Sequence, residues 1–185
     1  MSEEFVSRAG QKLAHALTTF KIDLTNKVCA DFGCSTGGFT DCMLRNGAQK
    51  VYSIDTGYGV LDWKLRNNPQ VVVMERTNAM HVELPEKVDF ITIDTSWTKQ
   101  KFVLPQALKF LKEDCYIVSL LKPHYEAERS WLVAGKVKPE YLEACIEKVK
   151  KDLEELKVKL LNIEVSPILG KQGENVEYLM YLTRA

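Results

Sequence analysis

The sequence lacks an excess of either charge, a long apolar run and an obvious leader. Its 185 residues hold 25 Lys+Arg and 25 Asp+Glu, so the formal net charge is zero. This excludes a globally basic nucleic-acid-binding protein but not a local basic face. No apolar stretch reaches the roughly 18 residues that a membrane-spanning helix needs. The start, MSEEFVSRAGQKL, has no apolar core behind a basic end, which argues against a secretory signal.

Paired cysteines and metal-ligand spacings are also missing. The 5 Cys are an odd number without a CxxC pair, which predicts a reduced, cytoplasmic protein with no disulfide framework. The 3 His are scattered, so we expect no metal site. Cys34 has no nearby His base in the sequence, and packing is the favoured interpretation of this residue.

Apolar runs of strand length alternate with helical patterns along the chain. We expect strands at 28–33, 51–55, 71–74, 88–94, 115–122, 157–165 and 176–183, and helices at 6–20, 37–46, 60–67, 100–112 and 139–156. This alternation predicts an α/β fold. We expect an open, seven-stranded, mostly parallel sheet with helices on both faces and an antiparallel C-terminal strand.

Charged residues end four of these strands, where open α/β sheets bind ligands. They are Asp31, Asp55, Asp94 and Lys122. Any one could be a helix cap or a solvated strand end, but four at one edge favour a site. Glu177 opens the last strand after a hairpin loop, so we expect it on the same edge.

Lys122 is a candidate general base at this edge. The following Pro123 keeps its backbone extended, so the side chain leaves the strand end. Desolvation by apolar neighbours favours the neutral amine, whereas Asp94 favours the ammonium form. Both protonation states remain open from sequence alone.

The segment DFGCSTGGFTD (31–41) is the strongest local motif. Gly33 follows a strand and Gly37-Gly38 open a helix, so the backbone can approach a ligand closely and present free N–H groups. The spacing matches neither GxGxxG nor the phosphate loop, and no Lys is present for a triphosphate. The motif favours a nucleoside ligand that carries a carboxylate. Asp55 can accept hydrogen bonds from the ribose hydroxyls of such a ligand.

Three tryptophans bear on this region. We expect Trp63 to pack beneath the glycine-rich segment. Trp97 and Trp131 flank the expected site in loops, where either ring can stack on a base or simply pack.

Several segments carry a family resemblance. With DFGCSTGGFTD they are SRAGQKL (7–13), DTGYGVLDWKLR (55–66), VVVMERTN (71–78), DFITIDTS (89–96), LLKPHYEA (120–127) and GENVEYLMYL (173–182). Nearly the whole chain resembles the hemolysin-A/TlyA family of FtsJ-like RNA ribose 2′-O-methyltransferases. The resemblance implies a class I (Rossmann-like) methyltransferase that uses S-adenosylmethionine and acts on RNA, most typically ribosomal RNA. It also implies an N-terminal helix at 1–24 packed on a methyltransferase domain at 25–185.

The resemblance assigns roles to individual residues. The implied catalytic residues are Lys12, Asp94, Lys122 and Glu177, of which Lys12 comes from the resemblance alone. The implied cofactor-binding residues are Asp31, Gly33, Ser35, Thr36, Gly37, Gly38, Asp55, Asn78 and Asp94. In this scheme Lys122 removes or polarises the 2′-hydroxyl proton. Asp94 and Glu177 set the charge and position of the two lysines, and Lys12 holds the hydroxyl or a neighbouring phosphate.

The sequence departs from the family in two places. Family members usually carry an S4-type RNA-binding domain before the methyltransferase domain, and we expect this chain to lack it. The chain is then a fragment, is tethered to RNA or a ribosomal subunit by an S4-like partner, or has a changed substrate. The segment TSWTKQ (95–100) is more polar than the apolar stretch that family members usually have at this place. This predicts an altered rim around the substrate site.

Three alternative functions remain beside RNA methylation. They are a non-catalytic S-adenosylmethionine-binding module, a small-molecule methyltransferase and a cytolysin-associated protein. The last is disfavoured because the sequence offers no membrane helix and no clear basic amphipathic helix.

Overall fold

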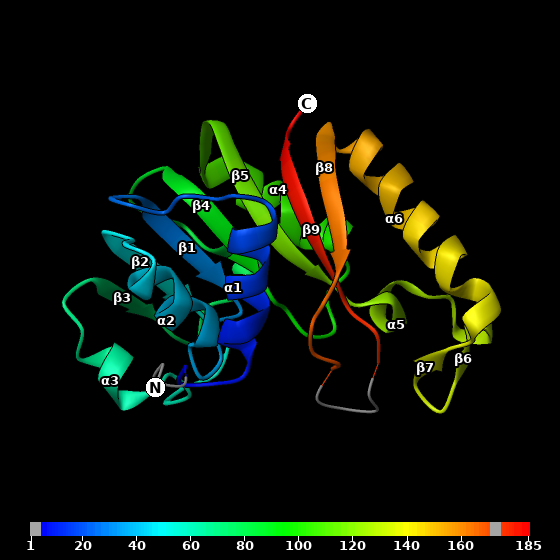
Figure 1. The fold of residues 1–185 in the computed structure, drawn as a ribbon, viewed down its shortest axis with the longest axis horizontal. Helices are drawn as coiled ribbons and strands as arrows, with labels where there is room; N and C mark the ends of the chain where they lie inside the picture. The colour runs from blue at the N-terminus through cyan, green and yellow to red at the C-terminus, as the bar shows by residue number, and fades with distance from the viewer. Residues whose placement is uncertain (1–4, 171–174) are drawn as a thin grey trace.

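A computed structural model describes residues 5–170 and 175–185. Its main feature is a seven-stranded sheet in the order β3-β2-β1-β4-β5-β9-β8 (Figure 1). The strands of this sheet are β1 (Val28–Phe32), β2 (Lys50–Ile54), β3 (Val71–Met74), β4 (Val88–Ile93), β5 (Leu111–Leu121), β8 (Val158–Val165) and β9 (Tyr178–Arg184). Within this sheet β9 alone runs opposite to the other six strands, which confirms the expected open, mostly parallel α/β sheet.

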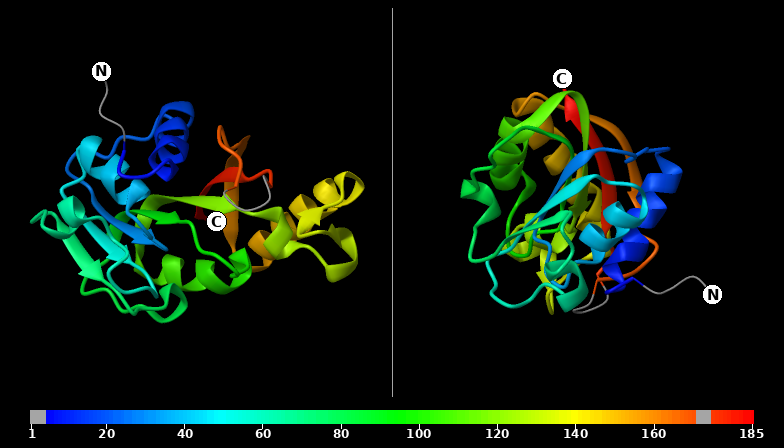
Figure 2. Two further views of the ribbon diagram at one scale, coloured as in Figure 1. Left: turned by 90° about the horizontal axis from the view of Figure 1, so that it is seen from below. Right: turned by 90° about the vertical axis from the view of Figure 1, so that its left-hand side faces the viewer.

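Helices cover both faces of the sheet, as Figure 2 shows. The α-helices are α1 (Ala9–Thr19), α2 (Gly38–Arg45), α3 (Trp63–Arg66), α4 (Gln100–Phe110), α5 (Pro123–Glu126) and α6 (Leu142–Glu155). Single 3₁₀ turns are η1 (Ala79–His81), η2 (Arg129–Trp131) and η3 (Pro139–Tyr141). The helices α1 and α2 share one core cluster with the sheet, and α4 and α6 share another on the opposite face.

Strand alternation explains why the sheet has an apolar core on each face. Successive side chains of a strand point to opposite faces, so a strand buried on both sides is apolar at every position. In β4, Phe90 belongs to the cluster beneath α1 and α2, whereas Ile91 and Ile93 belong to the cluster with α4 and α6. The helices contribute amphipathic stripes such as Cys145, Val149 and Leu153 of α6.

The register brings the ends of the strands together. Phe32 lies beside Ile54 and Ile93, so β1, β2 and β4 end at the same level. In the antiparallel pair of β5 and β9, Leu121 lies opposite Tyr178, which confirms that Glu177 falls beside Lys122 at the carboxyl edge.

Three local differences from the sequence prediction have physical causes. Strand β5 starts at Leu111, directly after α4, and a register shift between Val88 and Phe90 accommodates its early residues. The two-residue strands β6 (Leu132–Val133) and β7 (Lys136–Val137) form a hairpin too short to show a period. The predicted helix at 60–67 shortens to α3 because the Asp62 side chain caps it.

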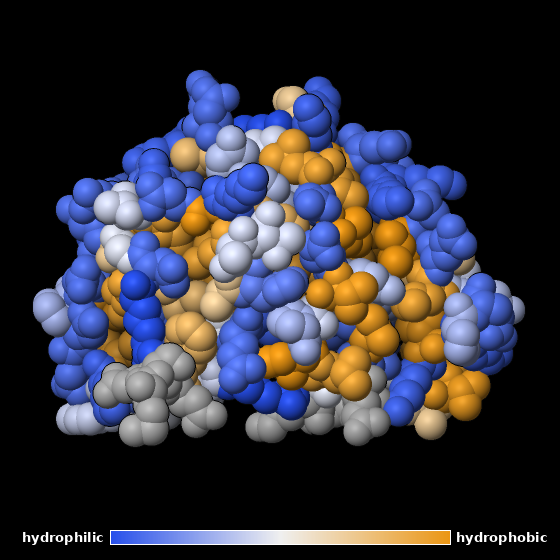
Figure 3. All heavy atoms as spheres, viewed as in Figure 1, coloured by the Kyte–Doolittle hydropathy of each residue, from blue (hydrophilic) through white to orange (hydrophobic). Residues whose placement is uncertain are grey.

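Apolar surface remains visible over the last strands. Figure 3 shows it on the side of β8 and β9 that faces the viewer in Figure 1. Next to it, Phe20 at the end of α1 stacks on Tyr181 of β9 with ring centroids 5.1 Å apart. This contact extends the core beneath α1 to the antiparallel strand.

Candidate functional site

Two adjoining cavities lie at the carboxyl edge of the sheet. The first has a volume of about 360 Å³ and the second about 520 Å³. The residues that line both are Gly33, Ser35, Asp94 and Ser96. The shared lining makes one continuous site with two compartments, which we call the loop cavity (the first) and the lysine cavity (the second).

The glycine-rich turn forms the wall between β1 and the loop cavity. Gly33 has φ +89°, and a Cβ there would lie 2.6 Å from the carbonyl oxygen of Asp94. Gly37 has φ +100°, and a Cβ there would collide with Leu61 and Leu65. Only glycine therefore fits at either position, and the turn passes close against the backbone that carries Asp94.

Asp55 points its carboxylate at the same turn. The N–H of Ser35 donates to Oδ2 at 2.8 Å, and the N–H of Gly57 donates to Oδ1 at 2.7 Å. Two fixed donors orient the group, and its remaining lone pairs can accept from ligand hydroxyls. Asn78 lines the same cavity, and its side chain accepts the N–H of Met80 at 2.9 Å as the cap of η1.

Asp31 sits behind the turn and lines neither cavity. It is fully buried, and its oxygens accept hydrogen bonds from Thr40 at 2.8 Å and Thr92 at 2.9 Å. Burial raises the pKa of its carboxyl to about 7. The structure thus gives this residue a supporting position beneath the turn, joined through Thr40 to Ser53 of β2.

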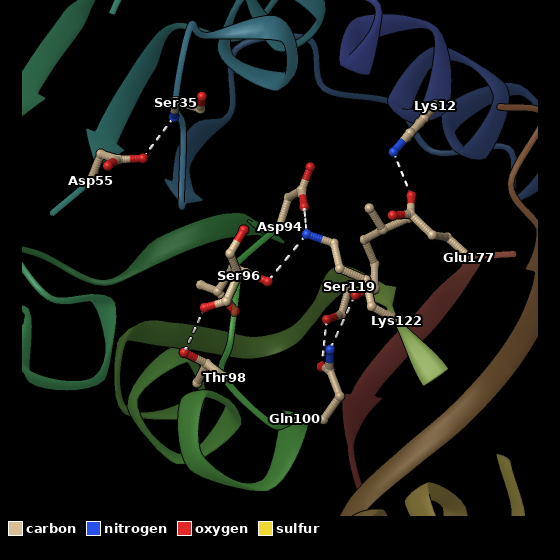
Figure 4. Close-up of polar contacts among 12 residues, drawn as sticks. Lys12, Ser35, Asp55, Asp94, Ser96, Thr98, Gln100, Ser119, Lys122 and Glu177 are labelled. Atoms are coloured by element: carbon tan, nitrogen blue, oxygen red, sulfur yellow. Dashed lines mark hydrogen bonds and ion pairs between the residues drawn. The ribbon is translucent and has the colours of Figure 1, made fainter. Parts of the chain in front are cut away.

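Two ion pairs line the lysine cavity. Lys12 Nζ lies 2.5 Å from Glu177 Oε2, and Lys122 Nζ lies 2.6 Å from Asp94 Oδ1. Figure 4 shows both pairs; Lys12 comes from α1, Glu177 directly precedes β9, and Asp94 and Lys122 directly follow β4 and β5. Lys122 also donates to the carbonyl oxygen of Thr95 at 3.2 Å. The four residues predicted to act together are therefore brought together, although they span most of the chain.

The remaining candidates take varied positions. Thr36 lines the lysine cavity, whereas Gly37 and Gly38 line neither cavity. At Gly38 a Cβ would meet the backbone N of Gly10 at 2.8 Å, so this glycine permits α2 to approach α1. Among the described residues, no group of three or more His, Cys, Asp and Glu could hold a metal ion.

The tryptophans differ from one another. Trp63 is 74% exposed, so the prediction that it packs beneath the turn is wrong; Leu61 and Leu65 occupy that place. Trp97 is 81% exposed at the rim of the loop cavity, with its ring tilted against Tyr125. Trp131 stacks on Tyr141 near α6, outside both cavities.

Some lining residues and a buried hydrogen-bond network were not predicted from the sequence. Thr56 and Thr77 line the loop cavity and lie in segments that carry the family resemblance, but neither was singled out as a site residue; Met80, which also lines it, lies outside those segments. Gln100, Ser119 and Glu126 hydrogen-bond beneath the lysine cavity, and only their tertiary contacts reveal them.

Comparison with known proteins places these features in a family. The model of the FtsJ-like methyltransferase family matches residues 5–184. The 16S/23S rRNA (cytidine-2′-O)-methyltransferase TlyA of Mycobacterium tuberculosis is 39% identical, and the match covers 96% of this chain and 68% of that protein.

Solved structures agree with this assignment. A protein from Streptococcus thermophilus that carries the hemolysin name superposes with a TM-score of 0.93 at 34% identity, over 100% of this chain and 70% of that one. A Listeria monocytogenes protein described as an S-adenosylmethionine-dependent methyltransferase shares the fold alone. Its TM-score is 0.66 at 16% identity, with 97% of this chain and 100% of that one covered.

In the part of the chain that the structure describes, no helix is both long enough and apolar enough to cross a membrane. Three observations lead to the same assignment. They are the sheet order, the glycine-rich turn with its acidic partner Asp55, and the family match over residues 5–184. The fold is the Rossmann-like methyltransferase fold, and the chain belongs to the FtsJ-like methyltransferase family.

Proposed function

We propose that this chain is an S-adenosylmethionine-dependent RNA methyltransferase that modifies a ribose 2′-hydroxyl, with ribosomal RNA as its substrate. The observation that carries the proposal is the placement of two lysine–carboxylate pairs in a cavity that adjoins the loop cavity. The name of the Mycobacterium tuberculosis relative supports the ribose and the ribosomal substrate. In this proposal the N-terminal segment at 1–24, of which residues 1–4 lie outside the described residues, supplies α1 as a helix packed on the methyltransferase domain at 25–185.

The loop cavity fits the proposed cofactor. Gly33 leaves room for a close approach, and Asp55 presents an oriented carboxylate to ribose hydroxyls. Asn78 lines the same cavity and is the proposed neighbour of the adenine, and Ser35, Thr36 and Asp94 are the other proposed cofactor-binding residues of the two cavities. When bound, S-adenosylmethionine supplies an activated methyl group. Asp31, Gly37 and Gly38 serve by shaping the turn.

Lys122 is the proposed base. Asp94 and the carbonyl of Thr95 hold Nζ at the junction of the two cavities. From there Nζ removes or polarises the proton of a ribose hydroxyl bound in the lysine cavity. Lys12, held by Glu177, contacts the hydroxyl or a neighbouring phosphate. Alignment of the hydroxyl oxygen is the other main contribution of the chain.

We propose that this chain and a second module or partner both contact the RNA. The ring of Trp97 offers a stacking surface for a base at the rim. Because the net charge is zero, we propose that an S4-like module or partner tethers the chain to a ribosomal subunit in the cytoplasm.

The proposal is tested by transfer of labelled methyl from S-adenosylmethionine to purified ribosomal subunits and naked rRNA. We expect nuclease-sensitive label with the wild type and a loss of about 10²–10⁴ in rate with Lys122→Ala, because a positioned base is removed. Lys109→Ala is the matched control, since Lys109 forms an exposed ion pair with Glu83.

Equal label from wild type and Lys122→Ala would contradict the assignment of the base. Absence of label from the wild type on every RNA, with cofactor binding intact, would contradict the proposed activity.

A further inference from the structure

The first residue of α4 lies at the centre of a buried hydrogen-bond network. The N–H of Gln100 donates to Glu126 Oε1 at 2.7 Å. Its side-chain Nε2 donates to the carbonyl of Leu120 at 3.2 Å, and Ser119 Oγ donates to its Oε1 at 2.6 Å. Figure 4 shows Gln100 and Ser119 joined beneath Lys122. One residue thus links α4, α5 and the end of β5.

Glu126 performs the capping of α4. The residue before the helix is Lys99, whose side chain makes no cap hydrogen bond. The first N–H groups of a helix have no partner within the helix and need acceptors from elsewhere. Glu126 provides this acceptor from α5 although it is 26 positions away in the sequence.

The network holds both sides of the Lys122–Asp94 pair. The loop at 94–99 begins where the N–H of Asp94 donates to the carbonyl of Phe32 at 2.9 Å, and it ends at Gln100. Lys122 Nζ contacts only two groups of the described residues, Asp94 Oδ1 and Thr95 O, within hydrogen-bond distance, and both lie in this loop. Lys122 itself follows Ser119 and Leu120, which Gln100 binds.

We propose that Glu126 is a positioning residue for the reaction: by holding Gln100, it keeps the loop at 94–99 and the end of β5 in the relative placement that sets Lys122 Nζ. This inference rests on the proposed function. Glu126 lines neither cavity and is 2% exposed, so it acts through other residues.

Its acceptor oxygen, and not a negative charge, is the feature that matters. Glu126 Oε2 has no hydrogen-bond partner in the described part of the chain, and burial raises the pKa of this carboxyl. Glutamine keeps the acceptor at the same distance from the backbone, whereas alanine removes it. The two substitutions therefore separate positioning from a simple requirement for charge.

The test compares Glu126→Ala, Glu126→Gln and the milder Ser119→Ala in methyl transfer to RNA. With Glu126→Ala we expect kcat to fall about tenfold, because small displacements of reacting groups cost up to 10² in rate. We expect the KM for RNA and the affinity for S-adenosylmethionine to stay unchanged, Glu126→Gln to restore kcat, and Ser119→Ala to show a smaller loss. The control is Glu147→Ala, which removes an exposed partner of Lys150 on α6.

A second readout does not depend on activity. The rate at which an amine-reactive acylating reagent labels Lys122, followed by peptide mass spectrometry, reports whether Nζ leaves Asp94. We expect faster labelling of Lys122 in Glu126→Ala and Ser119→Ala, with exposed Lys109 unchanged as the internal reference.

Unchanged kcat and unchanged labelling in Glu126→Ala and Ser119→Ala would overturn the inference. So would a loss of kcat accompanied by an equal loss of cofactor affinity, which indicates general disruption. If the wild type transfers no methyl to RNA, the proposed function fails, while the labelling of Lys122 still decides whether Glu126 positions it.

Discussion

At the scale of single residues, Asp31 has an unusual environment for a carboxyl. It ends the buried strand β1, and both of its oxygens are occupied by threonine hydroxyls. Desolvation raises its pKa from 3.8 to about 7, against the opposing effect of the threonine hydrogen bonds. The folded state therefore prefers the protonated form, and ionisation of Asp31 costs stability.

This preference predicts a pH-dependent stability. Because the pKa of Asp31 is raised in the folded state, its contribution to the free energy of unfolding is fully present below pH 3.8. This contribution is lost as the pH rises through about 7. In Asp31→Asn this group cannot ionise. We expect the free energy of unfolding of Asp31→Asn, relative to the wild type, to rise by up to about 4 kcal/mol between pH 4 and pH 8.

Urea unfolding of both proteins across this range measures the difference. Glu83→Gln, an exposed carboxylate paired with Lys109, is the control and should follow the wild type. A constant difference between Asp31→Asn and the wild type at every pH would show that Asp31 is ionised in the folded state.

At the scale of elements, the buried Lys12–Glu177 pair joins α1 to the segment that directly precedes β9. The two side chains are 8% and 5% exposed, and the residues are 165 positions apart. Removing one partner of such a pair leaves an uncompensated buried charge, whereas replacing both with apolar residues is often neutral. The pair therefore serves two purposes, which substitutions can separate.

We expect Lys12→Met to lower the free energy of unfolding by about 3–5 kcal/mol, and Lys12→Met/Glu177→Leu to recover most of it. Methyl transfer should be lost in both, because the proposed contact of Lys12 with RNA is gone. Urea unfolding and the transfer assay measure the two effects. Recovery of transfer together with stability in the double variant would assign the pair a purely structural role.

The helices and strands also show which elements can be predicted from sequence patterns. Long apolar runs predicted all seven strands of the main sheet, because burial on both faces leaves few polar positions. The β6–β7 hairpin was missed since strands of two residues have no periodicity. Trp63 was misplaced because a helix of four residues does not define which side is buried.

The same limit applies to the site. The ends of apolar strands can be recognised in a sequence, and this placed Asp94, Lys122 and Glu177 at one edge of the sheet. The register of β5 and β9 confirms that edge. Their chemical roles stay predictions. Gln100 and Glu126 could not be found, since their meeting depends on how α4 and α5 pack and not on any local pattern.

At the scale of the whole molecule, the loop cavity joins β1, β2, β4 and the segment at 77–80. A ligand held there contacts elements from the first half of the fold at once. A ligand that binds only the folded state raises the free energy of unfolding of the whole fold by RT ln(1 + [L]/Kd), where [L] is the free ligand concentration. Cofactor binding can therefore be measured without RNA or turnover.

We expect S-adenosylmethionine at 100 times its Kd to raise the free energy of unfolding by about 2.7 kcal/mol, which is a rise in Tm of about 5–10 °C for a domain of this size. In Asp55→Asn the amide NH₂ would face one of the two N–H donors, from Ser35 or Gly57, so the oriented acceptor is lost. The shift in Tm at the same cofactor concentration should then largely disappear.

Asp62→Asn is the matched control, because asparagine caps a helix as well as aspartate and Asp62 lines neither cavity. Its shift should equal that of the wild type. A full shift in Asp55→Asn would remove Asp55 from the binding site while leaving the cavity intact. No shift in the wild type at millimolar cofactor would mean that the loop cavity holds a different ligand, and the proposed reaction would lose its methyl donor.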